Sequence, residues 1–219
     1  DHKPKTSTIS IENTHNQCGG SPLTLDFIEN VNSIARKNNL KIHMDGARLF
    51  NASAAQRKSV KDIVENIDSV TFCLSKGLSC PIGSIISGSK PFITEARRWR
   101  KSIGGGMRQA GVIAAAGIYA LNNMVDRLEE DHVNAKNLAI GLSKIPEIII
   151  DTEYVKTNIL RFELADNINL KEFESELKKE GIIFNSSYGS VRMVTHYGIA
   201  SKDIDKVIET ITKVLKDLS

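Results

Sequence analysis

Long hydrophobic runs are missing from this chain of 219 residues, and no stretch has the length that a membrane-spanning helix needs. The amino-terminal residues, Asp-His-Lys-Pro-Lys, lack the apolar core of a secretion signal. Cysteine is scarce and odd in number, and Cys18, Cys73 and Cys80 do not have the close-paired spacing of a metal site. These absences predict a reduced, cytoplasmic protein without a membrane segment.

An excess of one charge is also missing, because 29 basic and 26 acidic residues leave a net charge of only +3. The basic residues are scattered along amphipathic segments and form no blocks. We therefore expect neither nucleic acid nor a membrane as a partner. Hydrophobic residues make up 41% of the chain, which is enough for a sizeable core.

The first 90 residues alternate between strand-like and helix-like segments. Apolar residues at helical spacing, with Thr24 or Asp26 placed to cap the first helix, predict helices over 24–38 and 49–66. Short apolar or alternating runs predict strands over 8–11, 41–44, 70–74 and 82–86. Strands separated by helices favour a mostly parallel sheet with helices on its faces.

The pattern changes at Phe92, where a long helical region begins and continues to about residue 142. The three glycines at 104–106 predict one break in it. Beyond Pro146, the sequence predicts strands over 148–150, 158–164, 182–184 and 191–194, with helices over 170–180 and from about 201. We therefore expect a partial large α/β domain over 1–142 and a small α+β domain over 143–219.

Two of the predicted strands deliver a charged side chain where they end. Asp45 follows Ile-His-Met, and Lys76 follows the apolar run at 70–74. A lysine beside an apolar strand end can lose its proton and form a Schiff base, and a carboxylate can keep a pyridinium nitrogen protonated. The pairing predicts pyridoxal 5'-phosphate (PLP) chemistry in the crevice that strand ends of an α/β sheet form.

Each of these residues also has an ordinary interpretation. An Asp-Gly pair after a strand is most often a turn, and the triple glycine can be a hinge. Arg48 can be a helix-start cation, Arg192 a solvated strand residue and His15 a structural histidine. Only the joint occurrence of these residues, in order along the chain, raises the functional interpretation above the structural one.

Five motifs together resemble the low-specificity L-threonine aldolases, which are PLP-dependent enzymes. The resemblance covers essentially the whole chain. The motifs are Ile11-Glu12-Asn13-Thr14-His15-Asn16, Met44-Asp45-Gly46-Ala47-Arg48, Cys73-Leu74-Ser75-Lys76-Gly77-Leu78, Gly104-Gly105-Gly106-Met107-Arg108-Gln109 and Val191-Arg192-Met193-Val194-Thr195-His196.

The resemblance implies the PLP-dependent transferase fold of aspartate aminotransferase (fold type I) and cleavage of L-threonine and L-allo-threonine to glycine and acetaldehyde. By motif position, Lys76 would form the Schiff base with PLP and Asp45 would pair with its ring nitrogen. Arg48 would lie by the ring oxygen and the substrate carboxylate. Arg108 would contact the phosphate across a subunit interface, which implies a homo-oligomer, a dimer or a tetramer.

The substrate side of the expected site has one arginine and two candidate bases. Arg192 matches the main carboxylate-binding arginine of the family. His2 lies 13 residues before His15 and matches, by spacing alone, a histidine near the substrate hydroxyl. Cleavage of the bond between Cα and Cβ needs a base for the hydroxyl proton, and His2 and His15 both remain open for this role because imidazole titrates near working pH.

Relative to the family, the chain begins late. The segment that carries a Gly-Thr phosphate cup and a histidine stacked on the cofactor ring is expected to precede Asp1. Two alternatives to the aldolase therefore stay open: a related PLP-dependent β-eliminating lyase, and a catalytically incomplete fragment that acts only as a subunit-interaction module.

Overall fold

The computed structural model describes residues 2–187 and 189–219, which pack as two units. The first unit combines the residues up to His15 with Pro22–Arg127, and the second combines Asn16–Ser21 with Leu128–Ser219. The domain boundary expected after residue 142 stays a prediction. Each unit has its own sheet and its own core, and each is described by itself.

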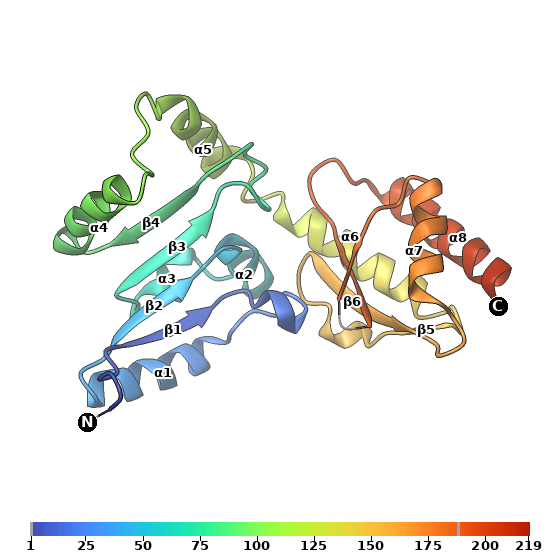
Figure 1. Ribbon diagram of the computed structural model, residues 1–219, viewed down its shortest axis with the longest axis horizontal. Helices are drawn as coiled ribbons and strands as arrows, with labels where there is room; N and C mark the ends of the chain where they lie inside the picture. The colour runs from blue at the N-terminus through green and yellow to red at the C-terminus, as the bar shows by residue number, and fades with distance from the viewer. Residues whose placement is uncertain (1, 188) are drawn as a thin grey trace. The chain divides into compact units, whose positions relative to one another are not determined.

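The first unit contains a four-stranded sheet of order β1-β2-β3-β4 (Figure 1). β1 to β3 are parallel, and β4 runs antiparallel to β3. Helices connect the parallel strands, whereas only a loop joins β3 to β4, and a strand that returns without a crossover must be antiparallel. The strands are β1 Thr8–Glu12, β2 Lys41–Asp45, β3 Ser69–Cys73 and β4 Ser84–Gly88. This arrangement confirms the expected mostly parallel sheet.

The connecting helices of this sheet are α1 (Leu25–Lys37), α2 (Leu49–Gln56) and α3 (Val60–Val64). Thr24 caps α1, because its Oγ1 accepts a hydrogen bond from the backbone N–H of Phe27 at 3.2 Å. The single helix predicted over 49–66 is wrong. Arg57 adopts a left-handed conformation (φ 51°) that ends α2, and Ser59 begins α3 with a capping box.

The core of the first unit lies where these helices cover the sheet. Met44 and Val70 of the strands pack with Ile28, Leu49 and Ile63, one from each helix. Burial of this apolar surface is the main force that holds the helices on the sheet. The strand ends are thereby fixed relative to one another.

Three helices follow β4, where the sequence predicts one long helical region with a single break. They are α4 (Lys90–Ser102), α5 (Gly111–Asn123) and α6 (Leu128–Leu142). The expected break at 104–106 is present, and Gly104 has the positive φ of 89° that glycine tolerates best. A second break at 124–127 separates α5 from α6, so the expectation of a single break is wrong.

The second unit contains an antiparallel sheet of order β5-β6-β8-β7 with α6, α7 and α8 packed on one face. Two short 3-10 helices, η1 and η2, belong to this unit. The further elements are β5 Ile148–Ile149, β6 Ile159–Leu164, β7 Asn185–Ser187, β8 Ser190–Val194, α7 Leu170–Lys179, α8 Ser201–Leu218, η1 Asn16–Cys18 and η2 Thr152–Tyr154.

The strand predicted over 182–184 is wrong, because β7 begins only at Asn185. Phe184 is buried against Phe173 of α7, with ring centroids 5.7 Å apart. The apolar run that suggests a strand therefore reflects packing against a helix. In this segment, the buried side chain belongs to Phe184, whereas pairing with β8 begins at the next residue, Asn185.

The two faces of the small sheet differ in chemistry. Leu160 and Phe162 of β6 and Val191 of β8 are buried in the helix-covered core. Gly141 of α6 allows close packing of α8, because a Cβ there would overlap the side chain of Ile208. The alternate residues of β6 and β8 lie on the opposite face, where Arg161 and Arg192 are polar while Ile159 is buried beside Gly20.

Candidate active site

The carboxyl ends of β1, β2 and β3 lie side by side in the first unit. Glu12 and Asp45 are register partners, and Asp45 is in turn paired with Thr71. The segments that follow these strand ends carry His15, Arg48 and Lys76. The sheet thus brings four of the predicted site residues, Asp45 included, to one edge, which is where parallel α/β sheets bind ligands.

Asp45 is exposed but firmly positioned. Its Oδ1 accepts a hydrogen bond from the backbone N–H of Ala47 at 3.0 Å, and its carbonyl oxygen accepts one from Asn13 at 2.9 Å. The next residue, Gly46, approaches β3 so closely that a Cβ would lie 2.7 Å from the carbonyl oxygen of Thr71. The glycine in this Asp-Gly pair is therefore required by close backbone approach, and the carboxylate is held at the strand end.

Lys76 lies in a short, closed loop after β3. Its carbonyl oxygen accepts a hydrogen bond from the N–H of Ser79 at 2.8 Å, and the backbone of Leu74 is bonded to Cys80 and Gly83 at 3.0 and 2.9 Å. The Lys76 side chain itself is exposed. A fixed backbone with an open amine suits a residue that has to react with a bound molecule.

Arg48 and His15 complete this group. Arg48 is partly buried and is the N-cap residue of α2. The Nε2 of His15 lies 3.6 Å from Oε2 of Glu12, and the two side chains are 40% and 30% exposed. Both side chains are therefore partly open at this end of the sheet.

Two polar groups beside this edge lack partners in the described part of the chain. Asn13 accepts a hydrogen bond from the N–H of Leu23 at 3.1 Å through Oδ1, but its Nδ2 is buried without an acceptor. The Oγ1 of the neighbouring Thr14 is also buried and unpaired. Unsatisfied buried groups are rare in folded proteins, so their presence here suits an edge that holds a polar molecule.

Two predicted residues do not join this group in the structure. His2 is exposed and precedes the amino end of β1, which is the end away from Asp45. Arg108 is also exposed, and it lies in the turn before α5, which begins only at Gly111. The proposed roles of both residues stay predictions.

Arg192 belongs to the second unit and lies on the polar face of its sheet. Its Nη1 donates a hydrogen bond to Oδ1 of Asn16 at 2.8 Å. Directly opposite on β6 is Arg161, whose Nη2 donates to Oε1 of Gln17 at 2.9 Å. Sequence reasoning missed Arg161, although one signal was present: a cation inside the otherwise apolar start of the strand Ile-Leu-Arg-Phe-Glu-Leu.

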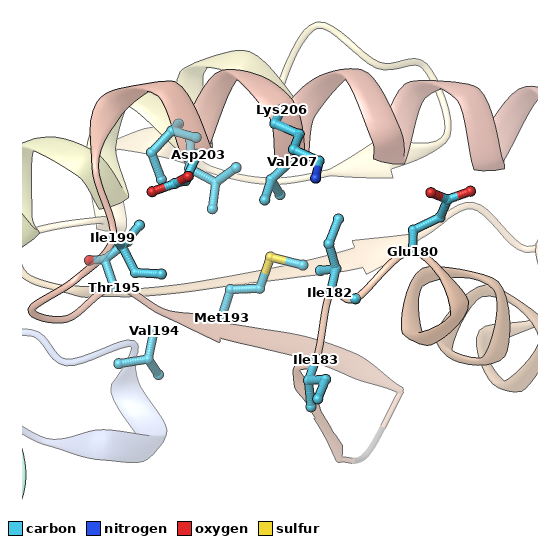
Figure 2. A pocket seen from close by; sticks show the side chains of 13 residues that line it. Glu180, Ile182, Ile183, Met193, Val194, Thr195, Ile199, Asp203, Lys206 and Val207 are labelled. Carbon is cyan, nitrogen blue, oxygen red and sulfur yellow. The ribbon is translucent and has the colours of Figure 1, made fainter.

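A separate, largely apolar pocket of about 380 Å³ lies in the second unit between β8, α8 and the segment after α7. Figure 2 shows Ile182, Met193 and Val207 around it, with Asp203 and Lys206 on α8. None of the predicted site residues lines this pocket. Within the described residues, no helix is long and apolar enough to cross a membrane, and no three His, Cys, Asp or Glu side chains could jointly hold a metal ion.

Comparison with known proteins shows which family the chain belongs to. The chain is 42% identical over 216 residues to a protein of Arabidopsis thaliana named probable low-specificity L-threonine aldolase 2, which covers 97% of this chain. It is 40% identical over 206 residues, 94% of this chain, to the low specificity L-threonine aldolase of Escherichia coli K12. The chain spans 61% of the length of the Arabidopsis protein and 60% of the length of the Escherichia coli protein.

The fold agrees with these sequence relationships. A PLP-dependent aminotransferase from Streptococcus suis superimposes with a TM-score of 0.73 at 19% identity, over 99% of this chain and 59% of that protein. The expected fold class, the α/β fold of PLP-dependent transferases (fold type I), is thereby confirmed. The sequence model of the beta-eliminating lyases matches residues 1–165. Because this match covers most of the chain, the protein belongs to the beta-eliminating lyase family.

Proposed function

We propose that this protein is a cytoplasmic, PLP-dependent aldolase that splits L-threonine and L-allo-threonine into glycine and acetaldehyde. The observation that carries the proposal is the common edge of the sheet, where Asp45 ends β2 and Lys76 lies in the loop that follows the neighbouring parallel strand β3. PLP needs an amine that can form a Schiff base and a carboxylate that faces its ring nitrogen, and the exposed Lys76 and the fixed Asp45 at this edge would supply the two groups. The unpaired Asn13 and Thr14 side chains beside it also suit a bound polar molecule.

Different residues would bind different parts of the cofactor. Lys76 would hold PLP through its Nζ, and Asp45 would face the ring nitrogen and keep it protonated. When bound, PLP supplies an electron sink for the charge that develops at the substrate Cα. Arg108 would contribute positive charge to the phosphate from a neighbouring subunit, so we propose a homo-oligomer.

Arginine side chains would orient the substrate. A guanidinium binds a carboxylate through two parallel hydrogen bonds in one plane, so it fixes the substrate's orientation as well as its position. Arg192 uses Nη1 for Asn16, which leaves the edge formed by Nε and Nη2 for such an anion. Arg48 would support the same carboxylate. The orientation at Cα decides which of its bonds breaks.

A histidine would accept the proton of the substrate hydroxyl. Between the two candidates, we favour His15, because it follows β1 at the edge that carries Asp45. Glu12, whose Oε2 lies 3.6 Å from Nε2 of His15, would help to orient the imidazole ring. His2 remains the second candidate. The transfer lets the hydroxyl carbon leave as an aldehyde.

The proposed function is tested with Lys76→Ala in the purified protein incubated with PLP. The variant is expected to lose the visible absorbance of bound PLP and all cleavage of L-threonine, and borohydride reduction should label only Lys76 in the wild type. Lys90→Ala, which changes an exposed lysine at the start of α4, is the matched control. Retained cofactor colour with a reducible lysine elsewhere would refute the assignment of Lys76.

The family description itself favours one alternative function, a β-eliminating lyase. The two reactions are distinguished by their products. Aldol cleavage of L-threonine yields glycine and acetaldehyde, whereas β-elimination releases the group at Cβ and, after hydrolysis by water, yields a 2-oxo acid and ammonia. A protein that binds no PLP and catalyses neither reaction would instead favour the subunit-interaction module.

A further inference from the structure

Two positive side chains face each other in the small sheet. Arg161 of β6 and Arg192 of β8 are register partners in an antiparallel pair, so both lie on the face opposite the apolar core. Directly opposite residues have Cβ atoms about 4.5–5.5 Å apart, and like charges in this arrangement destabilise a sheet. The pair therefore requires an explanation beyond the fold.

The described residues do not neutralise this pair of charges. Within the described residues, each guanidinium donates to one neutral amide oxygen, that of Asn16 for Arg192 and that of Gln17 for Arg161. Each Nε is buried and has no hydrogen-bond partner in the described part of the chain. Glu163, two residues further along β6 on the same face, is exposed and forms no ion pair with either arginine in the described part of the chain. Two charged groups are thus held in place with donors unused.

The adjacent residues Asn16 and Gln17 hold the two guanidiniums separately. Arg192 uses Nη1, so its Nε and Nη2 remain, and Arg161 uses Nη2, so its Nε and Nη1 remain. A guanidinium with two free donors can bind a carboxylate. Two separately held guanidiniums therefore offer two carboxylate positions.

Beside Arg161 there is room for a second group of a ligand. A pocket of about 450 Å³ is lined by Arg161, Gln17, Tyr154 and Val155, whereas Arg192 does not line it. The pocket also contains Asp151, whose Oδ1 accepts a hydrogen bond from the backbone N–H of Glu153 at 2.8 Å. Arg161 is thus the cationic residue of a pocket that lies on one side of the arginine pair.

We propose that Arg161 and Arg192 form a dicarboxylate-binding site, in which each guanidinium takes one carboxylate of a four-carbon ligand. The site would extend the proposed substrate class to acidic β-hydroxy-α-amino acids, and this catalytic consequence rests on the proposed function. 3-Hydroxyaspartate is the simplest. Its α-carboxylate binds Arg192 and its second carboxylate binds Arg161.

Cleavage of such a substrate balances without any further reactant. The bond between Cα and Cβ breaks and its electron pair stays on Cα, which takes up a proton to give glycine. The hydroxyl proton leaves to the base, and the carbon that carried it becomes the aldehyde carbon of glyoxylate. The second carboxylate remains unchanged throughout and serves only for recognition.

The binding step is tested without catalysis by calorimetric titration of succinate, with acetate as the single-carboxylate comparison. Arg161→Leu and Arg192→Leu should each weaken succinate binding at least about tenfold, since each removes a charge-assisted hydrogen-bonding group. Lys213→Leu, which removes one exposed positive charge from α8 on the other face of the sheet, should bind succinate as the wild type does. Arg161→Lys keeps the charge without the planar fork and should fall between.

Each result decides the proposal. Equal succinate binding by the wild type and Arg161→Leu, or acetate binding as tight as succinate binding, would overturn it. If Arg161→Leu does not fold, Arg161→Lys supplies the same comparison. The catalytic consequence is tested by measuring kcat/KM for 3-hydroxyaspartate and for L-threonine. Arg161→Leu should lower the ratio of the first value to the second. Threonine cleavage without succinate binding would refute only the site, and succinate binding that needs both arginines without any cleavage would refute only the proposed function.

Discussion

The Oδ1 of Asp45 accepts a hydrogen bond from the backbone N–H of Ala47 at 3.0 Å, and this bond fixes the carboxylate at the end of β2. Asp45→Asn keeps an acceptor for this bond, because the amide oxygen also accepts a hydrogen bond, but removes the negative charge. We expect turnover of L-threonine to fall at least about tenfold, while PLP affinity changes much less. Steady-state kinetics and a PLP titration measure the two quantities.

Asp45→Ala is the comparison for this variant, since it removes both the charge and the side-chain hydrogen bond to Ala47. It should lose PLP affinity as well as turnover. If Asp45→Asn changes turnover and PLP affinity to the same extent, or changes neither, the carboxylate does not act on the cofactor ring.

The base for the substrate hydroxyl is expected to be His15. His15→Gln should lower kcat for L-threonine about 10²–10⁴-fold, the usual contribution of a general base, with little change in PLP absorbance. His2→Gln is measured in parallel. A larger loss of kcat in His2→Gln than in His15→Gln would assign the role to His2 instead.

Arg108 tests whether each site needs two subunits. Arg108→Ala should weaken PLP binding without altering the circular dichroism spectrum of the protein. If Arg108 serves the neighbouring subunit, mixed dimers of Arg108→Ala and Lys76→Ala subunits contain one site with both defects and one with neither. Partial activity should then return on mixing. Absence of recovery, despite demonstrated subunit exchange, would place Arg108 in the site of its own chain.

Asp68 should contribute to the stability of the first unit in a pH-dependent way. Its Oδ2 accepts from the N–H of Ile42 at 2.9 Å and its Oδ1 from Nζ of Lys41 at 3.0 Å. Burial raises the pKa of this carboxyl group, but these two bonds and the charges of Lys41 and Arg36 outweigh it and hold the pKa below 3.8. The stabilisation is therefore complete above the unfolded pKa and is lost as pH falls through the lower folded pKa.

Asp68→Asn should accordingly lower the free energy of unfolding by about 1–3 kcal/mol near neutral pH, with a smaller difference in acid. Urea unfolding at several pH values measures both. Glu95→Gln, which neutralises an exposed acid of α4, should have little effect. A loss that is the same at every pH would show that the Asp68 carboxylate is not the source of the stabilisation.

The strands that lead to Asp45 and Lys76 can be predicted from sequence, because short apolar runs with β-branched residues favour buried strands. The likeness of five motifs to one family also follows from sequence alone, and so does the break at Gly104–Gly106. These features depend on residues close together in the chain. Local patterns are sufficient for them.

The tertiary structure alone decides which residues meet across long stretches of chain. Nothing local shows that Arg161 faces Arg192, because their pairing depends on the register of β6 with β8. Nor does it show that Asn16 and Gln17 hold these arginines, 176 and 144 residues away in sequence. The start of β7 after Phe184 has the same origin, since burial against Phe173 competes with strand pairing. Register and helix packing are set by the burial of apolar surface over the whole unit, which no short window of sequence contains.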